Sequence, residues 1–147
     1  WILLTLIHGT MVASDWPQWR GPNRDGVWTE TGIRSSFPAT GLVPNWKAAV
    51  GFGYSSPIIA SGRLYLSDLV VEKTYVHERV SCFDARSGKR VWQTQHETFP
   101  PDWFFNPEQM RGPGATPVIH NGRVYAISMF MTLECFDART GAVIMEA

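Results

Sequence analysis

The sequence predicts an all-β protein made of two similar four-stranded antiparallel units. One observation behind this prediction is an internal repeat. Ser56–Tyr65 matches Thr116–Tyr125 at five of ten positions, and Cys82–Trp92 matches Cys135–Met145 at six of eleven. The other observation is that short β-branched and aromatic runs are bounded by Gly, Asn and Asp, whereas no helical periodicity persists.

The composition is typical of a packed globular protein. The chain has 147 residues, of which 44% are hydrophobic and 13% aromatic. It carries 13 basic and 13 acidic residues without a basic stripe, so nucleic-acid binding is not expected. Because no continuous apolar run is long enough to cross a bilayer, a transmembrane helix is not expected either.

Residues 1–14 are predicted to be the remnant of a signal peptide. An apolar run opens the chain, and the small residues Val12 and Ser14 stand at the −3 and −1 places before Asp15. The alternative is a buried first strand. The signal peptide predicts export, so that the protein would be periplasmic, outer-membrane-associated or secreted.

The strands of the first unit are predicted at Pro57–Ala60, Arg63–Ser67, Arg79–Phe83 and Lys89–Thr94. The second unit follows the same order, with Asn121-Gly122 as a strong hairpin turn. The first unit is seven residues longer, and these residues fall in the connection between its second and third strands.

A turn of the form D-A-R-[ST]-G closes the third strand of each unit. Asp84 and Asp137 can accept hydrogen bonds from backbone N–H groups two or three residues further on, and Gly88 and Gly141 can adopt the left-handed conformation. A catalytic pair of carboxylates is the alternative. It is not favoured, because each Asp occupies the same place in its own repeat.

Four-stranded units of this length with a recurring turn indicate blades of a β-propeller. We assign blade 1 to 56–95 and blade 2 to 115–147. Trp46 lies upstream of Trp92 at a repeat-like distance, so 46–50 is predicted to be a lone outer strand that closes the last blade. Two blades do not form a ring. The sequence therefore predicts an N-terminal fragment of a propeller that needs its missing blades or self-association.

Several motifs identify a resemblance to a known family. They are DARSGK with Trp92, DARTG from Asp137 to Gly141, the Ser-Pro and Thr-Pro pairs that precede the blades, and DWPQWRGPNRDG from Asp15 to Gly26. The chain resembles the PQQ-like (quinoprotein-type) β-propeller repeat family, in an exported branch that carries the N-terminal signature. BamB-like propellers are relatives.

The resemblance implies two functions. Some members are dehydrogenases that hold pyrroloquinoline quinone (PQQ) and Ca²⁺ at the ring centre, and others are BamB-like interaction scaffolds. We expect a non-enzymatic scaffold in the cell envelope that binds a protein or an envelope ligand without a cofactor. The alternative is a PQQ- and Ca²⁺-dependent alcohol or sugar dehydrogenase. Cys82 and Cys135 occupy equivalent repeat positions, which are too far apart to bridge, so we expect buried free thiols and no disulfide.

Two segments are candidates for a site. The long loop predicted at 96–114 contains Asp102, Trp103 and Arg111, which could bind a ligand, although its aromatic side chains could instead bury themselves. Residues 15–45 are predicted to form a structural clasp across the last blade or the ring's rim. Within this clasp, Trp16 and Trp19 would cover apolar surface and Arg20 would bond carbonyl or carboxylate groups. No catalytic or metal-binding residue is predicted, since the histidines lack metal-ligand spacing.

Overall fold

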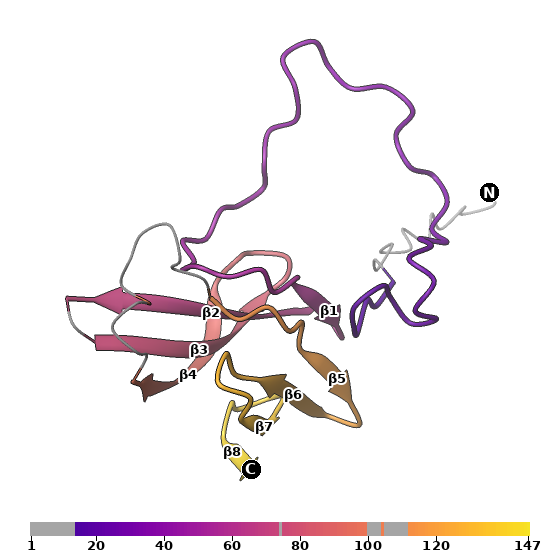
Figure 1. Cartoon of the computed structure of the whole chain (residues 1–147). Coiled ribbons are helices and arrows are strands. Elements are labelled where there is room, and N and C mark those ends of the chain that lie inside the picture. Colours follow the sequence, from indigo (N-terminus) through magenta and orange to yellow (C-terminus); the bar gives the residue numbers. More distant parts are fainter. Residues whose placement is uncertain (1–13, 74, 100–103, 105–111) are drawn as a thin grey trace, which may run out of the picture.

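The computed structural model describes residues 14–73, 75–99, 104 and 112–147. It confirms the all-β prediction. The described residues form eight strands in two four-stranded antiparallel sheets, which lie side by side in Figure 1. In this part of the chain, no helix is long and apolar enough to cross a membrane.

The first sheet contains β1 (Ile58–Ala60), β2 (Arg63–Glu72), β3 (Tyr75–Asp84) and β4 (Arg90–Thr98), paired in sequence order. The strands β2 and β3 are each ten residues long and pair without interruption. The extra residues of this unit therefore lengthen a hairpin instead of forming a loop. The physical reason is that Leu69 and Val76 are fully buried, so the extension has an apolar face to cover.

The second sheet repeats the same meander with β5 (Val118–His120), β6 (Arg123–Ile127), β7 (Leu133–Asp137) and β8 (Val143–Glu146). In both sheets the pairing register shifts at the same place. The shift lies between Cys82 and Phe83 in one sheet and between Cys135 and Phe136 in the other. Both cysteines are buried free thiols in the third strand of their sheet.

The predicted boundary between blade 1 and the long loop is three residues too early. β4 continues through Thr98, so His96 belongs to the strand and the connection begins after it. The polar side chains of His96 and its neighbours gave no sign of this extension. It follows from the pairing of β4 with the lengthened β3, from Val76 opposite Thr98 onwards.

Within the described ranges, the larger of two apolar clusters joins the two sheets. Trp92 of β4 lies near its centre, with its ring centroid 6.0 Å from that of Tyr65 and 6.3 Å from that of Phe136. The core draws on both sheets; its buried members are Ile58, Tyr65, Val80, Cys82, Trp92, Val124, Ala126, Phe136 and Ala138. Since each sheet covers one face of the other, the two blades form one packed unit.

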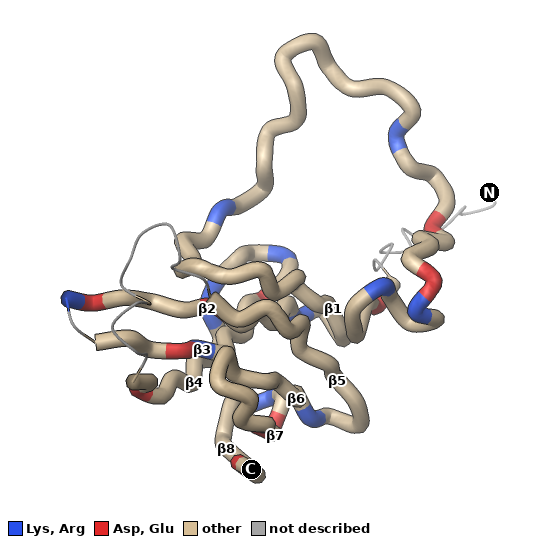
Figure 2. The backbone as a smooth tube through the Cα atoms, viewed as in Figure 1, with Lys and Arg blue, Asp and Glu red and all other residues tan. Residues whose placement is uncertain are grey.

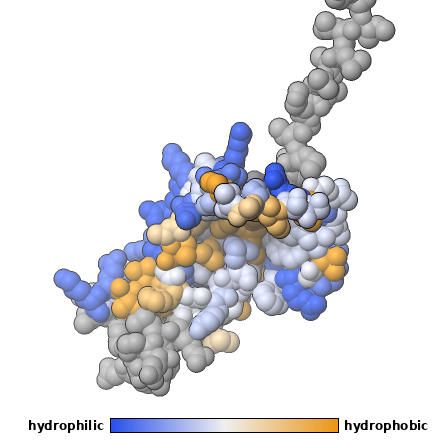
Figure 3. Space-filling view, turned by 90° about the horizontal axis from the view of Figure 1, so that it is seen from above, coloured by the Kyte–Doolittle hydropathy of each residue, from blue (hydrophilic) through white to orange (hydrophobic). Residues whose placement is uncertain are grey.

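The segment between the N-terminal residues and blade 1 forms an arc that stands away from the sheets (Figure 1). It carries exposed apolar side chains, among them Ile33, Phe37 and Val43. Acidic and basic residues are scattered along the arc and both sheets (Figure 2). On the face seen in Figure 3, apolar surface occurs in several separate patches between polar ones.

Candidate functional site

The two DAR turns have the same hydrogen bonds. Asp84 Oδ1 accepts from Ser87 N at 2.7 Å and from Ser87 Oγ at 2.6 Å, and Asp137 Oδ1 accepts from Thr140 N at 2.8 Å and from Thr140 Oγ1 at 2.7 Å. These hydrogen bonds to the carboxylates lower the pKa of both aspartates. Each carboxylate is therefore engaged in holding its own turn.

A tryptophan packs on each of these turns from the preceding part of the chain. Trp46 Nε1 donates to the carbonyl of Ala85 at 3.0 Å, and Trp92 Nε1 donates to that of Ala138 at 3.0 Å. The rings lie directly over Gly88 and Gly141, where a Cβ would come within 2.5 and 2.6 Å of ring atoms. Trp46 thus makes the contact with blade 1 that Trp92 makes with blade 2. Residues 46–50 themselves lie in no strand, and their closing of a last blade stays a prediction.

The N-terminal strap, which we define as Asp15–Pro17, joins the first strands of both sheets. Trp16 pairs with Ile59 of β1 through hydrogen bonds of 2.7 and 3.0 Å, and the carbonyl of Pro17 accepts from Ile119 N of β5 at 2.9 Å. Asp15 Oδ1 also accepts from Ser61 N at 2.9 Å. The strap thereby pairs edge groups of the first strands of blades 1 and 2. The placement of residues 15–45 across the last blade or the rim stays a prediction.

The two tryptophans of the clasp differ in their surroundings. Trp16 is half-buried and stacks on Trp28 with ring centroids 5.0 Å apart. Trp19 is 61% exposed within this chain, and its covering of apolar surface on the last blade or the rim stays a prediction. It lies in a compact turn in which Gly21 N donates to the carbonyl of Gln18 at 3.0 Å. Arg20 donates to the Asp25 carbonyl at 3.3 Å, as expected.

The loop candidates Asp102, Trp103 and Arg111 lie outside the described residues. Phe104 of the same loop is described, and its side chain is 1% exposed in a cluster with Leu69 and Val76. For this aromatic residue the structure supports packing, which was the alternative interpretation of the loop.

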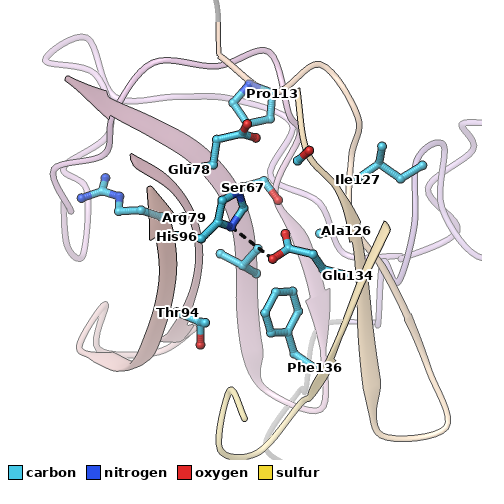
Figure 4. A pocket seen from close by; sticks show the side chains of 12 residues that line it. Ser67, Glu78, Arg79, Thr94, His96, Pro113, Ala126, Ile127, Glu134 and Phe136 are labelled. Carbon is cyan, nitrogen blue, oxygen red and sulfur yellow. Dashed lines mark ion pairs between the residues drawn. The ribbon is translucent and has the colours of Figure 1, made fainter. Parts of the chain in front are cut away.

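A small polar cavity lies between the two sheets, and the sequence gave no sign of it. Its lining includes Ser67, Glu78 and His96 of the first sheet and Glu134 of the second (Figure 4). Ser128, from the connection between β6 and β7, also lines it. Its volume is about 10 Å³, which is room for one water molecule. Alternating strand residues cannot reveal such a site, because Glu78 and Glu134 have the spacing of ordinary solvent-facing positions.

The contacts of the cavity cross from one sheet to the other. Glu78 Oε2 accepts from Met129 N at 2.8 Å, and His96 Nδ1 lies 3.2 Å from Glu134 Oε1. Ser67 Oγ and Glu78 Oε1 are buried and have no partner within the described structure. A buried oxygen atom without a hydrogen-bond partner lowers the stability of the fold unless a water molecule bonds to it or it becomes protonated.

The second half of the chain matches a known protein family. Residues 76–147 match the PQQ-type repeat family described as outer membrane protein assembly factor BamB. Over these residues the chain belongs to the PQQ-like β-propeller repeat family. No curated protein matches the chain significantly.

Solved structures that are similar to part of the chain include BamB and two dehydrogenases. BamB from Moraxella catarrhalis is 20% identical, with a TM-score of 0.35 over 67% of this chain and 36% of that protein. A europium-containing methanol dehydrogenase is 12% identical, with a TM-score of 0.34 over 67% and 25%. The quinohemoprotein alcohol dehydrogenase ADHIIG from Pseudomonas putida HK5 is 16% identical, with a TM-score of 0.33 over 69% and 21%. The chain thus spans about a third or less of the length of these proteins.

The first strands of the two blades supply few of the groups that PQQ with Ca²⁺ would call for. The quinone carries carboxylates that call for cationic partners, and Ca²⁺ takes six to eight oxygen ligands. These strands offer Ile-Ile-Ala in β1 and Val-Ile-His in β5. No group of three or more His, Cys, Asp or Glu in the described ranges could hold a metal ion.

Protonation of Glu78 and His96 at the polar cavity makes the folded state more stable at low pH than at high pH. Burial raises the pKa of Glu78, and the hydrogen bond to Glu134 raises that of His96. A raised pKa means that the folded protein binds protons more tightly than the unfolded chain. The stabilisation is thus present at low pH and is lost as the pH rises through the folded-state values of the two groups.

We expect Glu78→Gln to stabilise the protein at pH 8 by about 1 kcal/mol, the size of a buried polar group that lacks its partner. Glutamine keeps an acceptor for Met129 N and removes the buried charge. Urea unfolding between pH 4 and pH 8 measures this effect, which should vanish near pH 4. Glu97→Gln on the exposed part of β4 is the matched control and should change little. Equal destabilisation by Glu78→Gln at both pH values would contradict the expectation.

Proposed function

We propose that this PQQ-like propeller acts as a non-enzymatic binding scaffold in the cell envelope and that its ligand is a protein or an envelope component. The observation that carries the proposal is the N-terminal strap. It pairs with the first strand of each blade. In our proposal a ligand at the ring centre would compete with the strap for these strands.

The strap satisfies the polar groups of these strands with the chain's own backbone. Ile59 N donates to the carbonyl of Trp16, and the carbonyl of Ile59 accepts from Trp16 N. Ile119 N donates to the carbonyl of Pro17. A cofactor at this place would have to displace three backbone hydrogen bonds and the contact of Asp15 with Ser61. Each bond contributes about 1 kcal/mol net, so displacement is unfavourable without a compensating set of contacts.

Two further points support the envelope scaffold over the dehydrogenase. The description of the family that matches residues 76–147 names an outer membrane protein assembly factor, BamB. The apolar segment at the start of the chain, with small residues before Asp15, is typical of an export signal. Both agree with a protein that binds partners outside the cytoplasm.

A reconstitution experiment tests the proposal. The purified protein is incubated with PQQ and Ca²⁺ and assayed for cofactor retention by equilibrium dialysis and for dye-linked oxidation of methanol, ethanol and glucose. We expect no retention above that of bovine serum albumin and no dye reduction. A quinoprotein alcohol dehydrogenase reconstituted in parallel shows that the assay works. Saturable, Ca²⁺-dependent retention with turnover would establish the dehydrogenase instead.

A further inference from the structure

Two exposed aromatic residues face a hollow beside the N-terminal strap. The hollow has a volume of about 340 Å³ and is lined by Trp19, Tyr54, Gly114, Ala115 and Thr116. Trp19 is 61% exposed and Tyr54 is 71% exposed. We call this feature the aromatic hollow. It uses residues from the strap region and from the segments that precede β1 and β5, so it lies where the two blades meet.

The backbone on both sides of the aromatic hollow is fixed. Tyr54 N and Ser55 N both donate to the Pro113 carbonyl, at 2.9 and 3.0 Å, and Ser56 N donates to Thr116 Oγ1 at 3.1 Å. On the other side, the turn after Trp19 is closed by hydrogen bonds from Gly21 N and from the Arg24 side chain to Gln18. The rings are therefore held out on ordered backbone, which lowers the entropy lost on binding a partner.

The lining indicates the chemistry of the partner. It carries no charged side chain, so a neutral partner suits it. Its polar groups within the described structure are mainly donors that lack an acceptor, namely the Trp19 N–H and the Tyr54 O–H, whereas Thr116 Oγ1 already accepts a hydrogen bond. Gly114 and Ala115 keep the floor shallow, and a Cβ on Gly114 would meet open space. The flat rings of Trp19 and Tyr54, with their outward N–H and O–H donors, suit a rigid peptide. Such a peptide would place its own apolar rings on them and offer unpaired carbonyls to the two donors.

We infer that the aromatic hollow binds a proline-rich peptide in the polyproline II conformation. Such a peptide has no internal hydrogen bonds, offers its carbonyls to donors and loses little entropy when it docks on aromatic side chains. The inference rests on the proposed scaffold function and names the class of protein segment that the scaffold would take. A neutral sugar also stacks on aromatic rings, but its ring of hydroxyl groups requires more polar partners than this lining offers.

Fluorescence anisotropy with labelled decaproline tests the inference on the purified protein. We expect saturable binding by the unaltered protein and at least about tenfold weaker binding by Trp19→Ala and by Tyr54→Ala, as for central aromatic residues of an interface. Both side chains are exposed, so these variants should keep the thermal midpoint of the unaltered protein. Phe37→Ala, which removes an exposed aromatic ring on the arc, is the matched control and should bind decaproline unchanged.

Other outcomes overturn the inference. A lack of decaproline binding by the unaltered protein would do so, as would equal affinity of Trp19→Ala and the unaltered protein. If calorimetry showed cellohexaose bound, with the binding lost in Trp19→Ala and decaproline inactive, the hollow would be a sugar site. None of these results depends on PQQ retention, so failure of this inference and failure of the scaffold function are measured separately.

Discussion

Replacing Trp92 with alanine is expected to destabilise the protein by about 3–5 kcal/mol, the range for a large buried aromatic residue. The indole is 8% exposed, packs between Tyr65 and Phe136, and donates to the Ala138 carbonyl. Alanine would leave a cavity between the two sheets and a carbonyl without its donor. Because single domains have a net stability of about 5–15 kcal/mol, this one change should bring the fold close to unfolding.

Chemical denaturation monitored by far-UV circular dichroism measures this effect. Trp19→Ala removes the same side chain from an exposed position and should change stability by no more than about 0.5 kcal/mol. A loss for Trp92→Ala as small as that for Trp19→Ala would mean that the two sheets do not share the core described above.

Gly112→Ala is expected to cost about 3 kcal/mol, the upper part of the usual range for overpacking. A Cβ at residue 112 would overlap the Phe52 carbonyl oxygen and lie 2.6 Å from its carbonyl carbon and 2.8 Å from Gly53 Cα. These are backbone atoms, so relief requires the two segments to separate. Separation would break the hydrogen bonds of Tyr54 and Ser55 to Pro113, which hold the start of blade 1 against the start of blade 2.

Gly114→Ala provides a matched control two residues away. A Cβ at this position has nothing within 4 Å, so the change should alter the thermal midpoint little. The difference between the two variants isolates the close approach of the backbones. Similar midpoints for both would show that Gly112 does not contact Phe52 in solution.

The sequence was sufficient to predict the blades. The repeat of Cys82–Trp92 at Cys135–Met145 predicts two units with the same order of strands, and the structure has two four-stranded meanders with this order. Turn chemistry is local, so side chains such as Asp84 and Asp137 and the glycines that follow them could be assigned from neighbouring residues alone.

The features that join the blades could not be predicted in this way. The strap reaches β1 and β5 through backbone groups, which carry no sequence signal. Glu78 and Glu134 are buried where the first sheet meets the second unit, and strand alternation alone does not show which face becomes an interface. Trp19 is likewise exposed within this chain, which its residue type alone does not show.

Each tryptophan packs on the DAR turn of the blade that follows it in the chain, so the two sides of the blade pair differ. Trp46 uses the turn at Gly88 as Trp92 uses the turn at Gly141, so the contact is head to tail and its two sides are unlike. At the far side, the position equivalent to Trp92 is held by Met145, whose side chain is 42% exposed. Unlike surfaces cannot be related to themselves by a two-fold axis. Within the chain, this contact therefore adds each blade to the one before it in a single direction.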